Sequence, residues 1–163
     1  MKDRRLSMDY GFGGFFELRT PQQLLAKLRH DHARLAANPT DSYAAFDFFV
    51  TANSLVDWIW PSASPDQQKD NRHSDLLPRL CAHLADGAKH FLLDRPHYGV
   101  DGTVHDRAAF SRDAFQGDAF QTGKLMIILE AKEAGEIGQS TIDALTLATQ
   151  VLEYWSRRLG SST

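Results

Sequence analysis

The feature that most constrains the fold is residues 42–60, a segment that predicts a helix with apolar side chains on two sides. A helical wheel, with about 3.6 residues per turn, places Phe46 and Phe49 on one side and Phe48 and Leu55 nearly opposite. A helix that is apolar on two sides is typical of a central helix covered by neighbours on both. The apolar residues are Phe46, Phe48, Phe49, Val50, Leu55, Val56, Trp58, Ile59 and Trp60.

Three further helices are predicted around this central one. The first begins at Thr20, because Thr20-Pro21-Gln22-Gln23 has the pattern of a capping box with proline at the first helical position, and it ends at Asn38-Pro39. Another begins near Ser74 or Asp75, runs to about Leu93 and has Leu80, Cys81, Leu84 and Phe91 on its apolar face. The last opens at residues 140–143 and ends at Gly160. Residues 61–72 are predicted to be a loop.

A small β-structure is predicted before the last helix. Asp101-Gly102 lies between β-prone residues and favours a two-residue turn, so residues 98–105 predict a short hairpin. The apolar run 125–129 predicts a strand that pairs with this hairpin, with a buried helical turn as the alternative. The resulting fold class is mainly α: a bundle of about four helices with a small β-hairpin or short antiparallel sheet before the last helix.

The chain is expected to form one domain over residues 1–163, with residues 1–19 as an irregular arm rich in glycine and aromatic residues that lie on the core. The single cysteine, Cys81, cannot form an internal disulfide, which favours a reducing, cytoplasmic compartment. No apolar run is long enough for a membrane span. A net charge of −3 argues against broad binding of duplex DNA. We expect neither a cofactor nor a membrane partner.

One stripe of polar residues contains side chains suited to acid–base chemistry and phosphate binding. Arg79, His83, Asp86 and His90 are spaced by four, three and four residues, which places them on one face of the predicted third helix. A carboxylate one turn from an imidazole can orient the ring as an acid–base group, and arginine can bind phosphate. The alternative is a solvated helix face, because the stripe lies nearly opposite the apolar face.

Two resemblances bear on this stripe. The segments Phe48-Phe49-Val50-Thr51-Ala52 with Asp57-Trp58, and residues 81–91 (CAHLADGAKHF), resemble an uncharacterised bacterial protein family. The helical plan with arginine and histidine on one helix is similar to HEPN domains, helical homodimers that often act as RNases. That similarity implies a homodimer in which an arginine and a histidine are catalytic. Together with the spacing of the stripe, the candidate catalytic residues are Arg79, His83, Asp86 and His90. The separation of Arg79 and His83 is shorter than the corresponding one in HEPN domains.

The sequence therefore supports two functional hypotheses. The first is a homodimeric helical protein that binds or cleaves RNA or a nucleotide through the stripe. The second is a non-catalytic interaction module that uses the same polar face or the aromatic arm for a protein partner.

A metal site made of His83, Asp86, His90 and Asp57 is a weaker option, because such sites usually contain more carboxylates. Asp57 itself is expected to pair with an arginine or histidine of the helix at residues 74–93. Gly87, in the middle of that helix, is expected to mark the close approach of another backbone.

Overall fold

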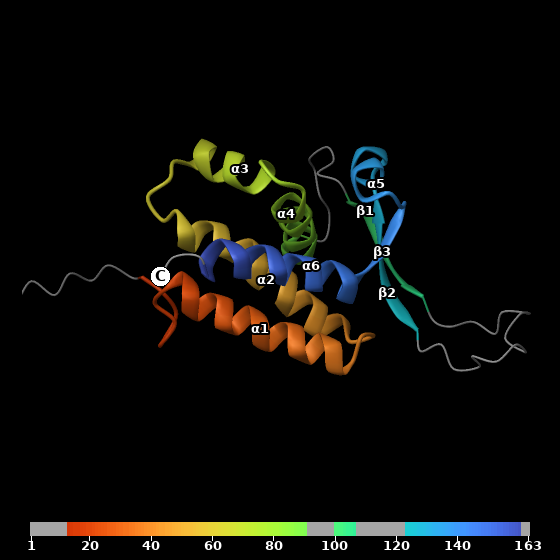
Figure 1. Cartoon of the computed structure of the whole chain (residues 1–163), viewed down its shortest axis with the longest axis horizontal. Coiled ribbons are helices and arrows are strands. Elements are labelled where there is room, and N and C mark those ends of the chain that lie inside the picture. Colours follow the sequence, from red (N-terminus) through yellow and green to blue (C-terminus); the bar gives the residue numbers. More distant parts are fainter. Residues whose placement is uncertain (1–12, 91–99, 107–122, 161–163) are drawn as a thin grey trace, which may run out of the picture.

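The computed structural model describes residues 13–90, 100–106 and 123–160, and its elements are drawn in Figure 1. In chain order these are α1 (Pro21–Ala37), α2 (Ser42–Ile59), α3 (Pro65–His73), α4 (Leu76–Lys89), β1 (Val100–Asp106), β2 (Lys124–Leu129), α5 (Ala131–Ile137), β3 (Thr141–Asp143) and α6 (Ala144–Gly160). The mainly helical fold with a small antiparallel sheet before the last helix is confirmed. The prediction of about four helices is too low, because α3 and α5 add two short ones within the described residues.

The helices form a bundle, and the sheet stands at one end of it (Figure 1). Helix α1 packs along α2 and α6, and α2 also packs against α3 and α4. The short helix α5 lies beside the sheet, where it contacts β2. Among the described residues, no helix is both long enough and apolar enough to cross a membrane.

Helix α2 is the central helix, as its two apolar sides predict. Asp41 caps its N-terminus by accepting hydrogen bonds from the backbone N–H groups of Tyr43 and Ala44. Phe48 and Leu55 are fully buried and Phe49 nearly so, whereas Phe46 is 48% exposed. The predicted buried position of Phe46 is therefore wrong. The buried residues of α2 are Ala44, Ala45, Phe48, Phe49, Thr51, Ala52, Asn53, Leu55 and Val56.

Local capping explains where α1 and α3 begin. The capping box of Thr20 and Gln23 is present at the start of α1, as predicted. An equivalent box, formed by Ser64 and Gln67 with proline at the first helical position, starts α3 inside the segment predicted to be a loop. Helix α3 buries none of its residues, so no apolar periodicity signals it.

Asp57 has the expected arginine partner, but from a different element. Arg72 of α3 donates to Asp57 Oδ2 at 2.5 Å and to Asn53 Oδ1 at 3.2 Å. Asn53 is buried in α2, so its amide oxygen needs such a donor. The prediction that the partner comes from residues 74–93 is wrong, because α3 lies between those residues and α2 in the chain and packs on both.

The sheet has the order β1-β2-β3, with both pairs antiparallel. Residues 125–129 form part of β2, which confirms the predicted strand. The predicted hairpin at Asp101-Gly102 is wrong, because residues 100–106 are one strand and the register of β1 and β2 shifts between Val100 and Gly102. An irregularity of this kind is a frequent role of glycine within a strand. The other residues of the predicted hairpin, 98–99, lie outside the described residues.

The C-terminal part begins with a strand. Residues 141–143, predicted to open the last helix, pair with β2 as β3, and α6 follows at Ala144. Asp143 still serves as a cap, because its Oδ1 accepts from the Thr146 backbone N–H at 3.0 Å.

In the described part of the N-terminal arm, Leu18 packs against the core, but the two phenylalanines do not lie on it. Phe15 is 60% exposed and Phe16 is 74% exposed, so the predicted burial of these two rings is wrong. The aromatic residues of the arm before residue 13 lie outside the described residues.

Candidate binding site

A cleft of about 530 Å³ lies where the helical bundle meets the sheet. Its walls come from α2, α4, β1, β2 and the first residue of α6. Small residues line it, among them Ala45 of α2, Gly87 and Ala88 of α4, and Ala144. Because these side chains stop at or before Cβ, the elements can meet and still leave a hollow between them. Phe49, Leu125 and Ile127 give the cleft a mainly apolar surface.

Gly87 stands at this cleft with open space beside it. A Cβ added at Gly87 would meet no heavy atom within 4 Å. The expectation that Gly87 marks the close approach of another backbone is therefore wrong. The missing side chain instead widens the cleft, at a cost of about 1 kcal/mol of helix propensity relative to alanine.

His83 is the one imidazole among the described residues that line the cleft. The ring is 8% exposed, and its Nδ1 accepts a hydrogen bond from the backbone N–H of Val100 at 3.0 Å. This bond joins α4 to the first residue of β1. Because Nδ1 is the acceptor, the neutral ring carries its hydrogen on Nε2. His83 thus holds the sheet against the bundle and forms part of the cleft wall.

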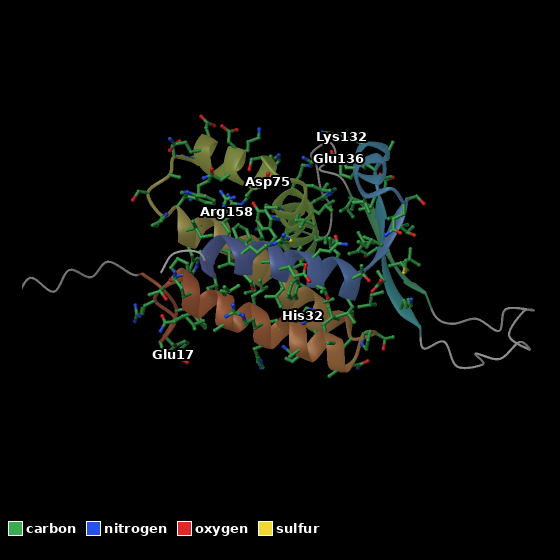
Figure 2. The ribbon with its side chains drawn as sticks, in the orientation of Figure 1. Glu17, His32, Asp75, Lys132, Glu136 and Arg158 are labelled. Atoms are coloured by element: carbon green, nitrogen blue, oxygen red, sulfur yellow. The ribbon has the colours of Figure 1, made fainter. Side chains whose placement is uncertain are left out.

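Arg79 is held by acidic side chains of α5. Its Nη2 lies 3.1 Å from Glu133 Oε1 and 3.0 Å from Glu136 Oε1, and only 13% of the Arg79 side chain is exposed. Figure 2 shows Glu136 on α5 next to the sheet. Two carboxylates already occupy donors of this guanidinium, so in this structure Arg79 ties α5 to α4. Both pairs use Nη2, and the buried Nε has no hydrogen-bond partner among the described residues, so the two carboxylates balance the charge of Arg79 without engaging all of its donors.

Asp86 is half-buried on α4, and its carboxylate acts on His73 of α3. Burial is the main cause that lowers the pKa of His73 on α3, and the cations Lys69, Arg79 and Arg72 lower it further. Asp86 acts in the opposite direction and raises the pKa of His73. The sequence offers no signal for this proximity, because it depends on how α3 folds back on α4.

His90 is exposed at the end of the helix, where its backbone N–H donates to the Asp86 carbonyl oxygen at 2.9 Å. Helix α4 ends at Lys89, earlier than the predicted end near Leu93, which lies outside the described residues. The four stripe residues therefore differ in their surroundings: Arg79 and His83 are covered, Asp86 is half-buried and His90 faces solvent. The alternative of a wholly solvated stripe is wrong, because β1 and α5 cover part of this face.

The candidate metal site finds no support in the described part of the chain. Within residues 13–90, 100–106 and 123–160, no three His, Cys, Asp or Glu side chains are arranged to hold a metal ion. The weaker option of a metal site from His83, Asp86, His90 and Asp57 therefore has no ligand set here. Cys81 is fully buried, and burial raises the pKa of its thiol, which favours an inert core residue.

The chain matches no protein-family model, and no curated protein or solved structure is significantly similar to it. The resemblances to the uncharacterised bacterial family and to HEPN domains therefore stay predictions.

Sequence reasoning found His83 but missed the cleft beside it. The sequence did not reveal two features of the cleft. One is strand β1, whose Val100 N–H donates to the His83 ring, and the other is the set of small residues of α2 and α4 that line the cleft. A signal for the second existed, since two small residues, Gly87 and Ala88, follow one another near the end of α4. The position of that pair relative to Ala45 is a property of the tertiary structure alone.

Proposed function

We propose that this protein is a binding domain that holds a small, largely apolar molecule in the cleft between α2, α4 and the sheet. The proposal is a non-catalytic function, as in the second hypothesis from the sequence, but with a small ligand in place of a protein partner. One observation carries it: an apolar cleft of about 530 Å³ with one buried imidazole among the described residues of its wall. Ligand sites of proteins typically have this size, with mainly apolar walls and a few placed polar groups.

The contacts of the stripe weigh against an RNA-directed acid–base site. Such a site needs a cation for phosphate and an imidazole whose nitrogens can exchange protons. Arg79 is engaged by Glu133 and Glu136, and His83 Nδ1 is engaged by Val100. A ligand cleft instead requires His83 to be held in place, which the Val100 bond achieves.

The test uses a neutral fluorescent probe, N-phenyl-1-naphthylamine, titrated into the full chain. Gly87→Phe is the blocking variant, because the ring would enter open space at the cleft rather than displace packed atoms. Gly135→Phe is the matched control: Gly135 also lies within a helix with open space beside it, but does not line the cleft. We expect the wild type and Gly135→Phe to bind the probe, and Gly87→Phe to bind it at least about tenfold more weakly.

Two outcomes would overturn the proposal. One is the absence of saturable probe binding to the wild type, which means that the cleft is closed in solution. The other is equal binding by both phenylalanine variants, which places the probe elsewhere.

A further inference from the structure

We infer that His83 makes the cleft sensitive to pH, because protonation of its imidazole releases β1 from α4 and removes one wall of the binding site. This inference rests on the proposed function, since it concerns the regulation of the same cleft. Its structural basis is the hydrogen bond from the Val100 N–H to His83 Nδ1, between two buried groups.

The chemistry of the bond gives the direction of the effect. A neutral imidazole accepts at Nδ1, whereas an imidazolium carries hydrogens on both nitrogens and can only donate. Protonation of Nδ1 would bring an N–H to face the N–H of Val100, and the bond is lost. The buried Val100 N–H then has no acceptor from His83, which is costly away from water.

The position of the bond links it to the cleft. Val100 is the first residue of β1, and residues 100–104 of that strand line the cleft together with His83. Contacts between α4 and β1 are few compared with those that join β1 to β2. Among the described residues, the buried bond between Val100 and His83 therefore has a large share in holding this end of the sheet against α4.

Charged groups of both signs lie around His83 among the described residues. On α4, Arg79 and Asp86 lie one turn to either side, and the charge of Arg79 is offset by Glu133 and Glu136 of α5. On β1, Asp101 lines the same cleft. The described lining residues of α2, β2 and α6 carry no charge. The two carboxylates favour the imidazolium, whereas burial of the ring and the bond from the Val100 N–H favour the neutral form.

The sign follows from these two states. The neutral ring is the form that holds β1, so the closed wall is present above the titration range of His83 and is lost as the pH falls through it. We expect the wild type to bind N-phenyl-1-naphthylamine about tenfold more weakly at pH 5 than at pH 7.5, which corresponds to about 1.4 kcal/mol.

The variant that tests the mechanism is His83→Asn. The asparagine Oδ1 can take the place of Nδ1 as the acceptor for Val100, and the amide does not titrate. We expect His83→Asn to bind the probe equally at both pH values, and His83→Phe, which has no acceptor, to bind it weakly at both. His30→Asn is the control, since His30 is an exposed histidine of α1 outside the cleft lining. It should keep the wild-type pH response.

A second measurement does not depend on the probe. The hydrogen-exchange protection factor of the Val100 amide, followed by NMR, should fall between pH 7.5 and pH 5 in the wild type and stay constant in His83→Asn. If the wild type binds the probe equally at both pH values and Val100 stays protected, the pH inference is wrong while the binding proposal stands. If Val100 loses protection but no probe binds at either pH, the binding proposal fails and the switch itself is supported.

Discussion

The guanidinium of Arg79 and the carboxylate of Glu133 form an ion pair at 3.1 Å, with 13% and 5% of the two side chains exposed. The pair joins α4 to α5, and strands β1 and β2 lie between these two helices in the chain. The nearly buried carboxylate of Glu133 depends on Arg79, because water has little access to this carboxylate and cannot take the place of the cation.

Removal of Arg79 should therefore destabilise the protein. We expect Arg79→Met to lower the free energy of unfolding by about 3–5 kcal/mol, the usual cost of leaving one buried charge without its partner. The double variant Arg79→Met/Glu133→Leu should recover most of this loss. Glu136→Gln should cost no more than about 1 kcal/mol, because 41% of the Glu136 side chain is exposed. Urea unfolding measures all three, and an unchanged midpoint for Arg79→Met would contradict the role of this pair.

Two phenylalanines of the same helix provide a test of the central position of α2. Phe48 is fully buried, whereas Phe46 is 48% exposed. Phe48→Ala should cost about 3–5 kcal/mol of unfolding free energy, the range found for buried aromatic residues. Phe46→Ala should cost much less, because its ring already contacts solvent. Similar losses for both variants in urea unfolding would show that α2 does not have the orientation described.

Two glycines should respond to alanine with opposite signs. Gly87 lies inside α4 with open space beside it, so Gly87→Ala should stabilise the protein by about 0.5–1 kcal/mol. Gly138 ends α5 with φ at +85°, a left-handed conformation that disfavours a Cβ. Gly138→Ala should therefore destabilise the protein by about 1–2 kcal/mol. Thermal unfolding followed by circular dichroism would measure both, and a loss of stability in Gly87→Ala would mean that the site is not open.

Tyr154 should titrate above the ordinary range for tyrosine. Its hydroxyl donates to Asp75, and Arg158 lies near both groups (Figure 2). Burial, followed by the hydrogen bond to Asp75, raises the pKa of Tyr154 to about 12. The neutral phenol is the form favoured by folding, so this contribution to stability is complete below pH about 10 and is lost as the pH rises towards 12.

Absorbance titration of the phenolate would measure this pKa, with Tyr154→Phe to identify the signal. The variant should remove a component that titrates near 12 and leave the remaining tyrosine signal unchanged. Loss of a component near 10 instead would show that Tyr154 is neither buried nor hydrogen-bonded to Asp75 in solution as described.

The RNA hypothesis also has a direct test. A site built on the stripe predicts that the protein cleaves or binds single-stranded RNA without added metal, with a steep loss as salt rises. His90→Ala is the informative variant, because His90 is exposed and its substitution should leave stability within about 0.5 kcal/mol. The cleft proposal predicts no RNA cleavage and no effect of His90→Ala on probe binding. RNA cleavage that His90→Ala abolishes would instead support the stripe.

The sequence by itself determined the features that depend on neighbouring residues. The capping box of Thr20 and Gln23 forms from side chains three residues apart, so the start of α1 follows from local hydrogen bonding. The two apolar sides of residues 42–60 predicted the central helix, because burial of both sides requires neighbours on both. The apolar run of β2 was likewise visible in the sequence.

Only the tertiary structure decided which faces are covered and what the stripe contacts. Helix α3 buries no residues, so apolar periodicity cannot predict its position. Arg72 fixes that position by binding Asp57 and Asn53 of α2. His83 lies 17 residues from Val100, and Arg79 lies 57 residues from Glu136. Contacts over such separations depend on the path of the intervening chain, whereas helix spacing describes only which residues share a face. The spacing placed Arg79 and His83 on one face correctly, and the packing of β1 and α5 turned that face into part of the interior.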